Sequence, residues 1–194
     1  ETVVKIQPID RKMMQVAQKR WDSIAHPLHS LGLFEDVLVE IAGMTGRQDM
    51  KIRKKALVTM CADNGVVEEG VTQTGQEVTA LVAENFLVTQ AAASILCREC
   101  GADIYPVDVG MAVDTKVPSF KTSYGTKNMA KEPAMTREEA IHALEVGIHM
   151  AEKLVGEGYG MLATGEMGIG NTTTSSAVAS VLLHKPAEEM TGRG

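Results

Sequence analysis

Apolar residues near the start of the chain recur at helical spacing. Steps of three and four positions predict an amphipathic helix over residues 9–26, with Asp10 as its cap. The same spacing predicts a second helix over about 30–43, ended by Gly43 and Gly46. Residues 1–50 are therefore expected to be the helical part of a small domain.

Beyond residue 50 the pattern changes to short apolar runs that alternate with helical segments. Buried parallel strands read as nearly continuous apolar runs, and the helices that connect them cover both faces of the sheet. We therefore predict an α/β fold with a Rossmann-like parallel sheet, helices on both faces and a small N-terminal helical part. Strands are expected at 56–62, 104–109 and 159–164, and helices at 77–100, 136–156 and from about 172.

Residues 51–194 are expected to be an incomplete large domain, because the chain stops in a loop-like Thr-Gly-Arg-Gly sequence. Ligands of parallel sheets bind beyond the carboxyl ends of the strands. This rule places the loops 63–77, 108–133 and 166–173 on one functional rim.

The net charge argues against two classes of binding partner. The chain has 19 Lys and Arg against 25 Asp and Glu, a net charge of −6, so neither nucleic acid nor an anionic membrane surface is an expected partner. No apolar run approaches 18 residues, and the first residues lack the pattern of a signal peptide. Three cysteines suit a reducing compartment, so a cytoplasmic location is expected.

The glycine-rich stretch 165–176 is the most informative motif. A strand, a glycine turn and a helix start bring unpaired backbone N–H groups and the positive end of a helix together, which predicts a phosphate site. Asn171 stands where a P-loop needs its lysine, and the third glycine of a dinucleotide motif is missing. In the alternative interpretation the glycines only allow close packing of helix on strand.

Single residues near this motif are candidates for chemistry. A carboxylate beside a phosphate is unfavourable unless it serves hydroxyls or a positive charge, so Glu166 is expected to face ribose or a developing cation. Arg193 could supply a cation, or could be an exposed loop residue. Asp108 ends a strand on the rim and is either functional or a carboxylate that braces its loop.

The sequence gives little support for a metal site or a redox-active thiol pair. The pair Cys97 and Cys100 ends a helix, whereas reactive thiols favour a helix start, and no second pair completes a zinc site. The histidines form no metal-binding motif, and His142 and His149 are expected to be half-buried or surface residues. We therefore expect neither a metal site nor a redox-active thiol pair.

Four segments in the order of one known family support a resemblance. The segments are Ala62–Val66 with Glu69–Thr72 and Glu77–Thr79, Val107–Gly110, Gly125–Met129 with Glu132–Thr136, and Gly165–Thr173 with Thr191–Gly194. On these residues the chain resembles the nicotinate-nucleotide:dimethylbenzimidazole phosphoribosyltransferases of cobamide biosynthesis, and it covers a little over half of their length.

The resemblance implies a pentosyltransferase without cofactors. A lower-ligand base attacks C1′ of nicotinate mononucleotide, nicotinate leaves, and an α-ribotide 5′-phosphate forms with inversion. The family's general base is a glutamate that would lie beyond residue 194. The implied partners are nicotinate mononucleotide and an aromatic base, with a homodimer, or a heterodimer with a paralogue, as the assembly.

The resemblance also implies roles for individual residues. Glu166 would support catalysis. The lower-ligand pocket would involve Asp63, Thr72 and Ala80. The phosphate and ribose would be bound by Gly168, Ile169, Gly170, Asn171, Thr172, Thr191, Gly192, Arg193 and Gly194.

Two departures from the family pattern affect the choice of base. Asn64 replaces the usual histidine, and Ala80 replaces a glutamine that contacts benzimidazole, so a phenolic base is an alternative acceptor. An alternative function is that of a non-catalytic, nucleotide-binding subunit of a heteromeric enzyme that acts on phenolic bases.

Overall fold

A computed structural model describes residues 2–49 and 51–192. The chain divides into two compact units, Glu1–Ile52 and Arg53–Gly194. The division falls two residues after residue 50, where the pattern of apolar residues along the sequence changes.

The first unit is a helical hairpin preceded by a short turn. The carboxylate of Asp10 accepts from the N–H groups of Lys12 and Met13, which fixes the predicted start of the first helix. The elements are η1 (Val3–Lys5), α1 (Arg11–Ser23) and α2 (Leu33–Thr45).

The second helix runs past Gly43, so the prediction that Gly43 ends it is wrong. Gly43 is buried, and a Cβ there would lie 2.5 Å from Cγ of Met14. The absence of a side chain therefore serves close packing of the hairpin, while Gly46, with φ of +64°, ends the helix. The buried core of the hairpin is Ala17, Val39 and Ala42.

The second unit contains a three-stranded parallel sheet in the order β2-β1-β3, which confirms the predicted fold class. The strands are β1 (Lys55–Ala62), β2 (Asp103–Gly110) and β3 (Met161–Met167). The third strand begins later and ends later than predicted. Glu166 pairs with Met60 and Met167 with Cys61, so pairing with β1 holds these residues in the sheet.

Helices follow each strand. The predicted capping box at Thr136 is present, since its hydroxyl accepts from Glu139 N and the Glu139 carboxylate accepts from Thr136 N. The remaining elements are η2 (Gly65–Glu69), α3 (Glu77–Leu87), α4 (Ala92–Glu99), α5 (Arg137–Gly156), α6 (Asn171–Leu183) and α7 (Ala187–Met190).

The segment between β1 and β2 is two helices, so the prediction of one helix over 77–100 is wrong. Thr89 has φ of +56° and interrupts the helical path, and Gln90 N donates to Asn85 O. By composition alone Glu77–Glu99 is long and apolar enough to cross a membrane. Neither α3 nor α4 reaches the length of about 20 residues that a span requires, and both pack on the sheet.

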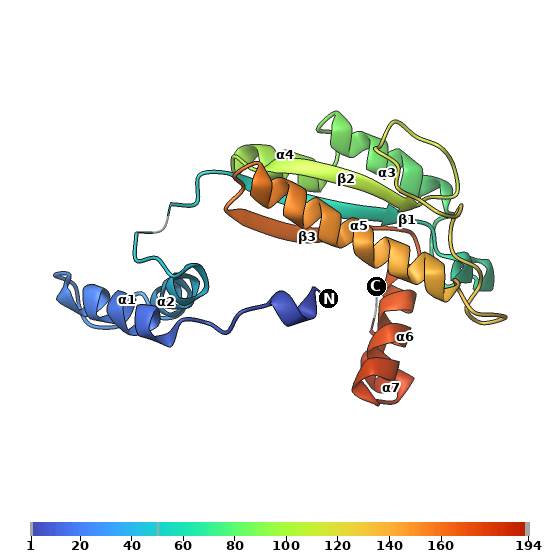
Figure 1. The fold of residues 1–194 in the computed structure, drawn as a ribbon. Helices are drawn as coiled ribbons and strands as arrows, with labels where there is room; N and C mark the ends of the chain where they lie inside the picture. Colours follow the sequence, from blue (N-terminus) through green and yellow to red (C-terminus); the bar gives the residue numbers. More distant parts are fainter. Residues whose placement is uncertain (1, 50, 193–194) are drawn as a thin grey trace. The chain divides into compact units, whose positions relative to one another are not determined.

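Alternation along the strands sends side chains to two cores on opposite faces of the sheet. One face packs under α5 through Val58, Val107 and Met150, and the other packs under α3 and α4 through Cys61 and Phe86. Figure 1 shows α5 across one face of the sheet and α6 leaving beyond the carboxyl end of β3. Helices therefore cover both faces, as predicted.

Candidate active site

The turn between β3 and α6 is a helix start with open donors. Gly170 caps α6 with φ of +87°, and the first N–H that donates back into the helix is that of Thr174. The N–H groups of a first helical turn have no acceptor inside the helix, so those of Thr172 and Thr173 are open to a ligand. With the positive end of the helix, they form a setting for an anion.

Close packing requires the glycines of this turn. A Cβ on Gly168 would lie 2.2 Å from the carbonyl oxygen of Ala62. One on Gly170 would lie 2.9 Å from Cγ2 of Val67, at a positive φ. Close packing therefore requires Gly168 and Gly170, and it places the turn directly against the end of β1. This packing leaves the N–H groups of Thr172 and Thr173 open, so it is compatible with an anion at the same turn.

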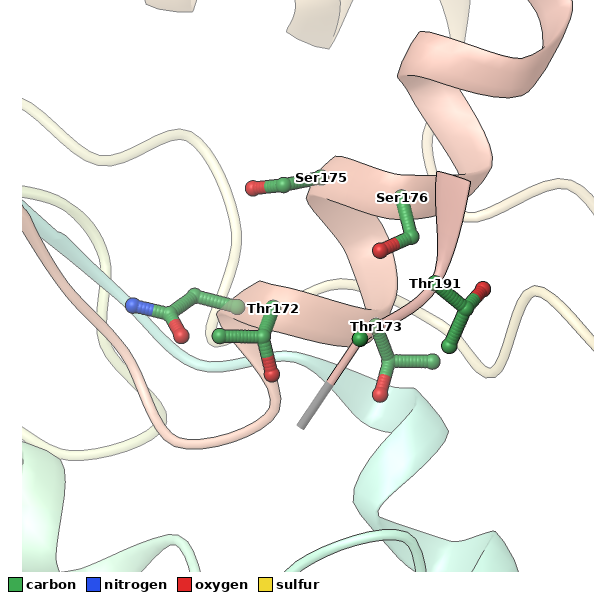
Figure 2. A pocket seen from close by; sticks show the side chains of 7 residues that line it. Thr172, Thr173, Ser175, Ser176 and Thr191 are labelled. Atoms are coloured by element: carbon green, nitrogen blue, oxygen red, sulfur yellow. The ribbon is translucent and has the colours of Figure 1, made fainter. Parts of the chain in front are cut away.

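A cavity of about 360 Å³ opens at the start of α6. Its side chains come from the first two turns of α6 and from the segment after α7, and most carry hydroxyl groups (Figure 2). The cavity brings together Thr172, Thr191 and Gly192, which the sequence placed in one site. The complete lining is Asn171, Thr172, Thr173, Ser175, Ser176, Thr191 and Gly192.

Three of these residues were not among the predicted binding residues. Thr173, Ser175 and Ser176 continue the hydroxyl-rich run, and that run was the available signal. Arg193 and Gly194, which were predicted to join the phosphate loop, lie outside the described residues.

Glu166 lies near the end of β3, and its side chain faces Asn171 at the start of α6. The Asn171 side-chain amide donates to the Glu166 carboxylate. Desolvation by the surrounding protein raises the pKa of Glu166, and the hydrogen bond from Asn171 partly offsets that rise. The expected role of Glu166 toward ribose hydroxyls or a developing cation stays a prediction.

The peptide group of Ile169 is held on both sides. Its N–H donates to the hydroxyl of Thr79 at 3.0 Å, and its carbonyl oxygen accepts from the amide of Asn64 at 3.1 Å. The Ile169 N–H is therefore already engaged, so the predicted role of Ile169 in phosphate binding would be to shape the turn rather than to donate.

The residues predicted for the lower-ligand pocket lie apart from this cavity. Asp63 is buried and accepts from Ala112 N at 2.7 Å, so it braces the loop after β2. The hydroxyl of Thr72 donates to Thr74 O, and Ala80 packs against the core under α3. Their role in base binding stays a prediction.

Asp108 braces its loop in a similar way. One carboxylate oxygen accepts from Gly110 N and Met111 N, and the other lies 3.0 Å from the Lys121 ammonium. Lys121 also lies 3.1 Å from a carboxylate oxygen of Asp114. Desolvation lowers the pKa of Lys121, but its contacts with the two carboxylates outweigh that effect, so the pKa is raised. Of the two interpretations of Asp108, these contacts favour the bracing one.

The described residues contain no group of three or more His, Cys, Asp or Glu side chains arranged for a metal ion. Within the same residues all three cysteines are free. Burial raises the pKa of Cys61 to about 12, and burial also raises the pKa of Cys97.

Comparison with known proteins connects this geometry to a family. The family model DBI_PRT, described as a phosphoribosyltransferase, matches residues 6–194. The chain belongs to this family.

Named relatives and solved structures agree. The nicotinate-nucleotide–dimethylbenzimidazole phosphoribosyltransferases of Clostridium tetani and Acetivibrio thermocellus are each 47% identical over 197 residues. They match 100% of this chain and 54% and 56% of their own lengths. The crystal structure of CobT from Thermus thermophilus matches with a TM-score of 0.90 and 37% identity, over 94% of this chain and 56% of that one.

The chain therefore spans a little more than half the length of these family members. The hydroxyl-lined cavity at α6 is therefore the candidate subsite for the phosphate and ribose of a family substrate.

Proposed function

We propose that the full-length protein transfers the phosphoribosyl group of nicotinate mononucleotide to an aromatic lower-ligand base. The products are nicotinate and an α-ribotide 5′-phosphate, which is α-ribazole 5′-phosphate when the base is dimethylbenzimidazole. This reaction belongs to cobalamin biosynthesis, and it matches the activity named for the relatives.

One observation carries the proposal: the cavity at the start of α6, with its hydroxyl groups and open N–H donors. A monophosphate that is retained through the reaction needs binding rather than activation. A helix start without a lysine supplies binding without the charge that phosphoryl transfer requires.

In the proposed step, this part of the chain mainly has to orient the substrate. The nitrogen lone pair of the base forms a bond to C1′, and the bond from C1′ to the nicotinate nitrogen breaks, with its electron pair returning to the ring. The benzimidazole N–H proton goes to a general base, which we expect beyond residue 194. A positively charged ring that leaves as a neutral one is a good leaving group, so orientation supplies much of the rate.

Glu166 has a supporting role in this scheme. Its carboxylate lies beside the proposed phosphate subsite, held by Asn171, where a negative charge favours the positive charge that develops on the ribosyl ring. Hydrogen bonds to ribose hydroxyls are the other contribution that its position allows.

Chromatography tests the reaction directly. The full-length protein is incubated with nicotinate mononucleotide and, in parallel, dimethylbenzimidazole, phenol or p-cresol. We expect nicotinate and an α-ribotide in equal amounts with at least one base. Release of nicotinate without ribotide, or no turnover with any base, would contradict the proposal. Turnover of phenols alone would revise the acceptor to a phenolic base.

The assembly and location are part of the proposal. We expect a homodimer in the cytoplasm, with no stable complex with nucleic acid or membranes. Light scattering of the purified full-length protein measures the assembly, and a monomeric mass at working concentration would contradict it.

A further inference from the structure

The Ile169 peptide group connects two walls of the proposed site. Its N–H donates to Thr79 Oγ1 and its carbonyl oxygen accepts from Asn64 Nδ2. Thr79 is fully buried and Asn64 is 8% exposed, so water does not compete freely for these bonds. The peptide belongs to the phosphate turn, while both partners belong to the segment expected to form the base pocket.

Asn64 has further partners that fix its orientation. Its Oδ1 accepts from the Thr174 hydroxyl at 2.8 Å, and its backbone oxygen accepts from Gln76 Nε2 at 3.0 Å. One residue therefore connects the first turn of α6, the phosphate turn and the loop that leads into α3.

The backbone leaves little room for independent movement of these parts. The Cα of Gly168 faces the Ala62 carbonyl so closely that no side chain fits there. A shift of the phosphate turn would therefore have to break the bonds to Asn64 and Thr79 or carry residues 63–79 with it.

We infer that Asn64 and Thr79 are positioning residues that couple the phosphate subsite to the base pocket, so that the two substrates bind with positive cooperativity. A phosphate that holds the turn in one position also holds residues 63–79 in the matching position through Ile169, so the base binds a segment already in the arrangement that the phosphate favours. The inference rests on the proposed function, because it assigns the two walls to the two substrates of that reaction.

Binding measurements on the full-length protein test the coupling. Ribose 5-phosphate serves as the probe of the phosphate subsite, because it has no nicotinate to lose and cannot react. Its Kd is measured by calorimetry with and without saturating dimethylbenzimidazole, or with phenol if only phenols are turned over. We expect the base to tighten ribose 5-phosphate binding by about fivefold or more in the wild-type protein, the lower end of ordinary coupling between sites.

Variants assign the coupling to the named residues. Thr79→Val removes the acceptor for the Ile169 N–H at nearly constant volume and should bring the coupling factor close to one, and Thr79→Ser should restore it. Asn64→Asp keeps an acceptor for Thr174 but cannot donate to Ile169, so it should reduce the coupling in the same way. It is the second variant if Thr79→Val does not fold.

Thr115→Val is the matched control, because the Thr115 hydroxyl also accepts from a backbone N–H, that of Val117. It should leave the coupling unchanged. Wild-type protein that turns over nicotinate mononucleotide but binds the two ligands independently would overturn the inference and leave the proposed function standing. Protein with no turnover and no binding would instead count against the proposed function.

Discussion

Asn171, the first residue of α6, donates its side-chain amide to the carboxylate of Glu166, near the end of β3. The pair closes the turn that carries the proposed phosphate subsite. It holds an acidic side chain beside the proposed phosphate subsite, and desolvation raises the pKa of that side chain.

Glu166→Gln should lower kcat of the full-length protein by at least about tenfold, since the charge that favours the developing ribosyl cation is lost. The glutamine still accepts from Asn171, so the fold should persist. Steady-state kinetics measure the effect, with Glu145→Gln on the exposed side of α5 as the control. Full activity of Glu166→Gln would remove Glu166 from the mechanism.

The same variant should change the pH dependence of stability in a defined direction. A carboxyl group whose folded pKa is raised contributes stability below its unfolded value, ordinarily 4.5, and that contribution is lost as pH rises through the folded value. The stability of Glu166→Gln relative to wild type should therefore increase from pH 4 to pH 7. Thermal melts at several pH values measure it, and a relative decrease would contradict the pKa direction.

Gly168→Ala should displace the phosphate turn, because its Cβ would lie 2.2 Å from the Ala62 carbonyl oxygen. We expect a lower melting temperature and binding of nicotinate mononucleotide weakened by about tenfold or more, as displaced binding groups imply. Gly156→Ala is the control, since no atom lies within 4 Å of its Cβ position. Equal behaviour of the two variants would show that the turn is not tightly packed.

Lys121→Met should destabilise the second unit by about 3–5 kcal/mol, because it leaves the buried Asp108 carboxylate without its cation. The double variant Asp108→Asn/Lys121→Met should recover much of the loss, since asparagine retains an acceptor for Gly110 and Met111. Urea unfolding measures both. A single variant within about 1 kcal/mol of wild type would mean that the pair does not brace the loop.

Thiol labelling at pH 8 should separate the three cysteines. Cys100 is exposed and should react first, and Cys97, whose pKa is raised by burial, should react more slowly. Cys61 is fully buried with a pKa of about 12, so it should react only in denaturant. Mass spectrometry of labelled peptides gives the order, and rapid labelling of Cys61 would contradict the packing under α3.

Local pattern was sufficient for most elements. Apolar runs located three strands, Asp10 and Thr136 marked two helix starts, and the hydroxyl-rich run marked the cavity. The local pattern gave wrong predictions where contacts between distant residues determine the structure. Gly43 serves packing against Met14 rather than a helix end, and pairing with β1 keeps Glu166 in a strand.

The break at Thr89 had no sequence signal, because neither glycine nor proline marks it. The contacts of Ile169 with Asn64 and Thr79 join residues about a hundred positions apart and depend on where the sheet brings the loops. Motif reasoning identified the phosphate turn, but it did not reveal which residues hold that turn in place.

The measurement that tests the central claim most directly compares two ligands of the full-length protein by calorimetry. Nicotinate mononucleotide and nicotinate riboside differ only in the 5′-phosphate that the hydroxyl-lined cavity at α6 is proposed to bind. We expect the mononucleotide to bind at least about tenfold more tightly, with the difference largely lost in Gly168→Ala, since several open donors and a helix start act on the phosphate. Equal affinity for the two ligands would contradict the assignment of this cavity.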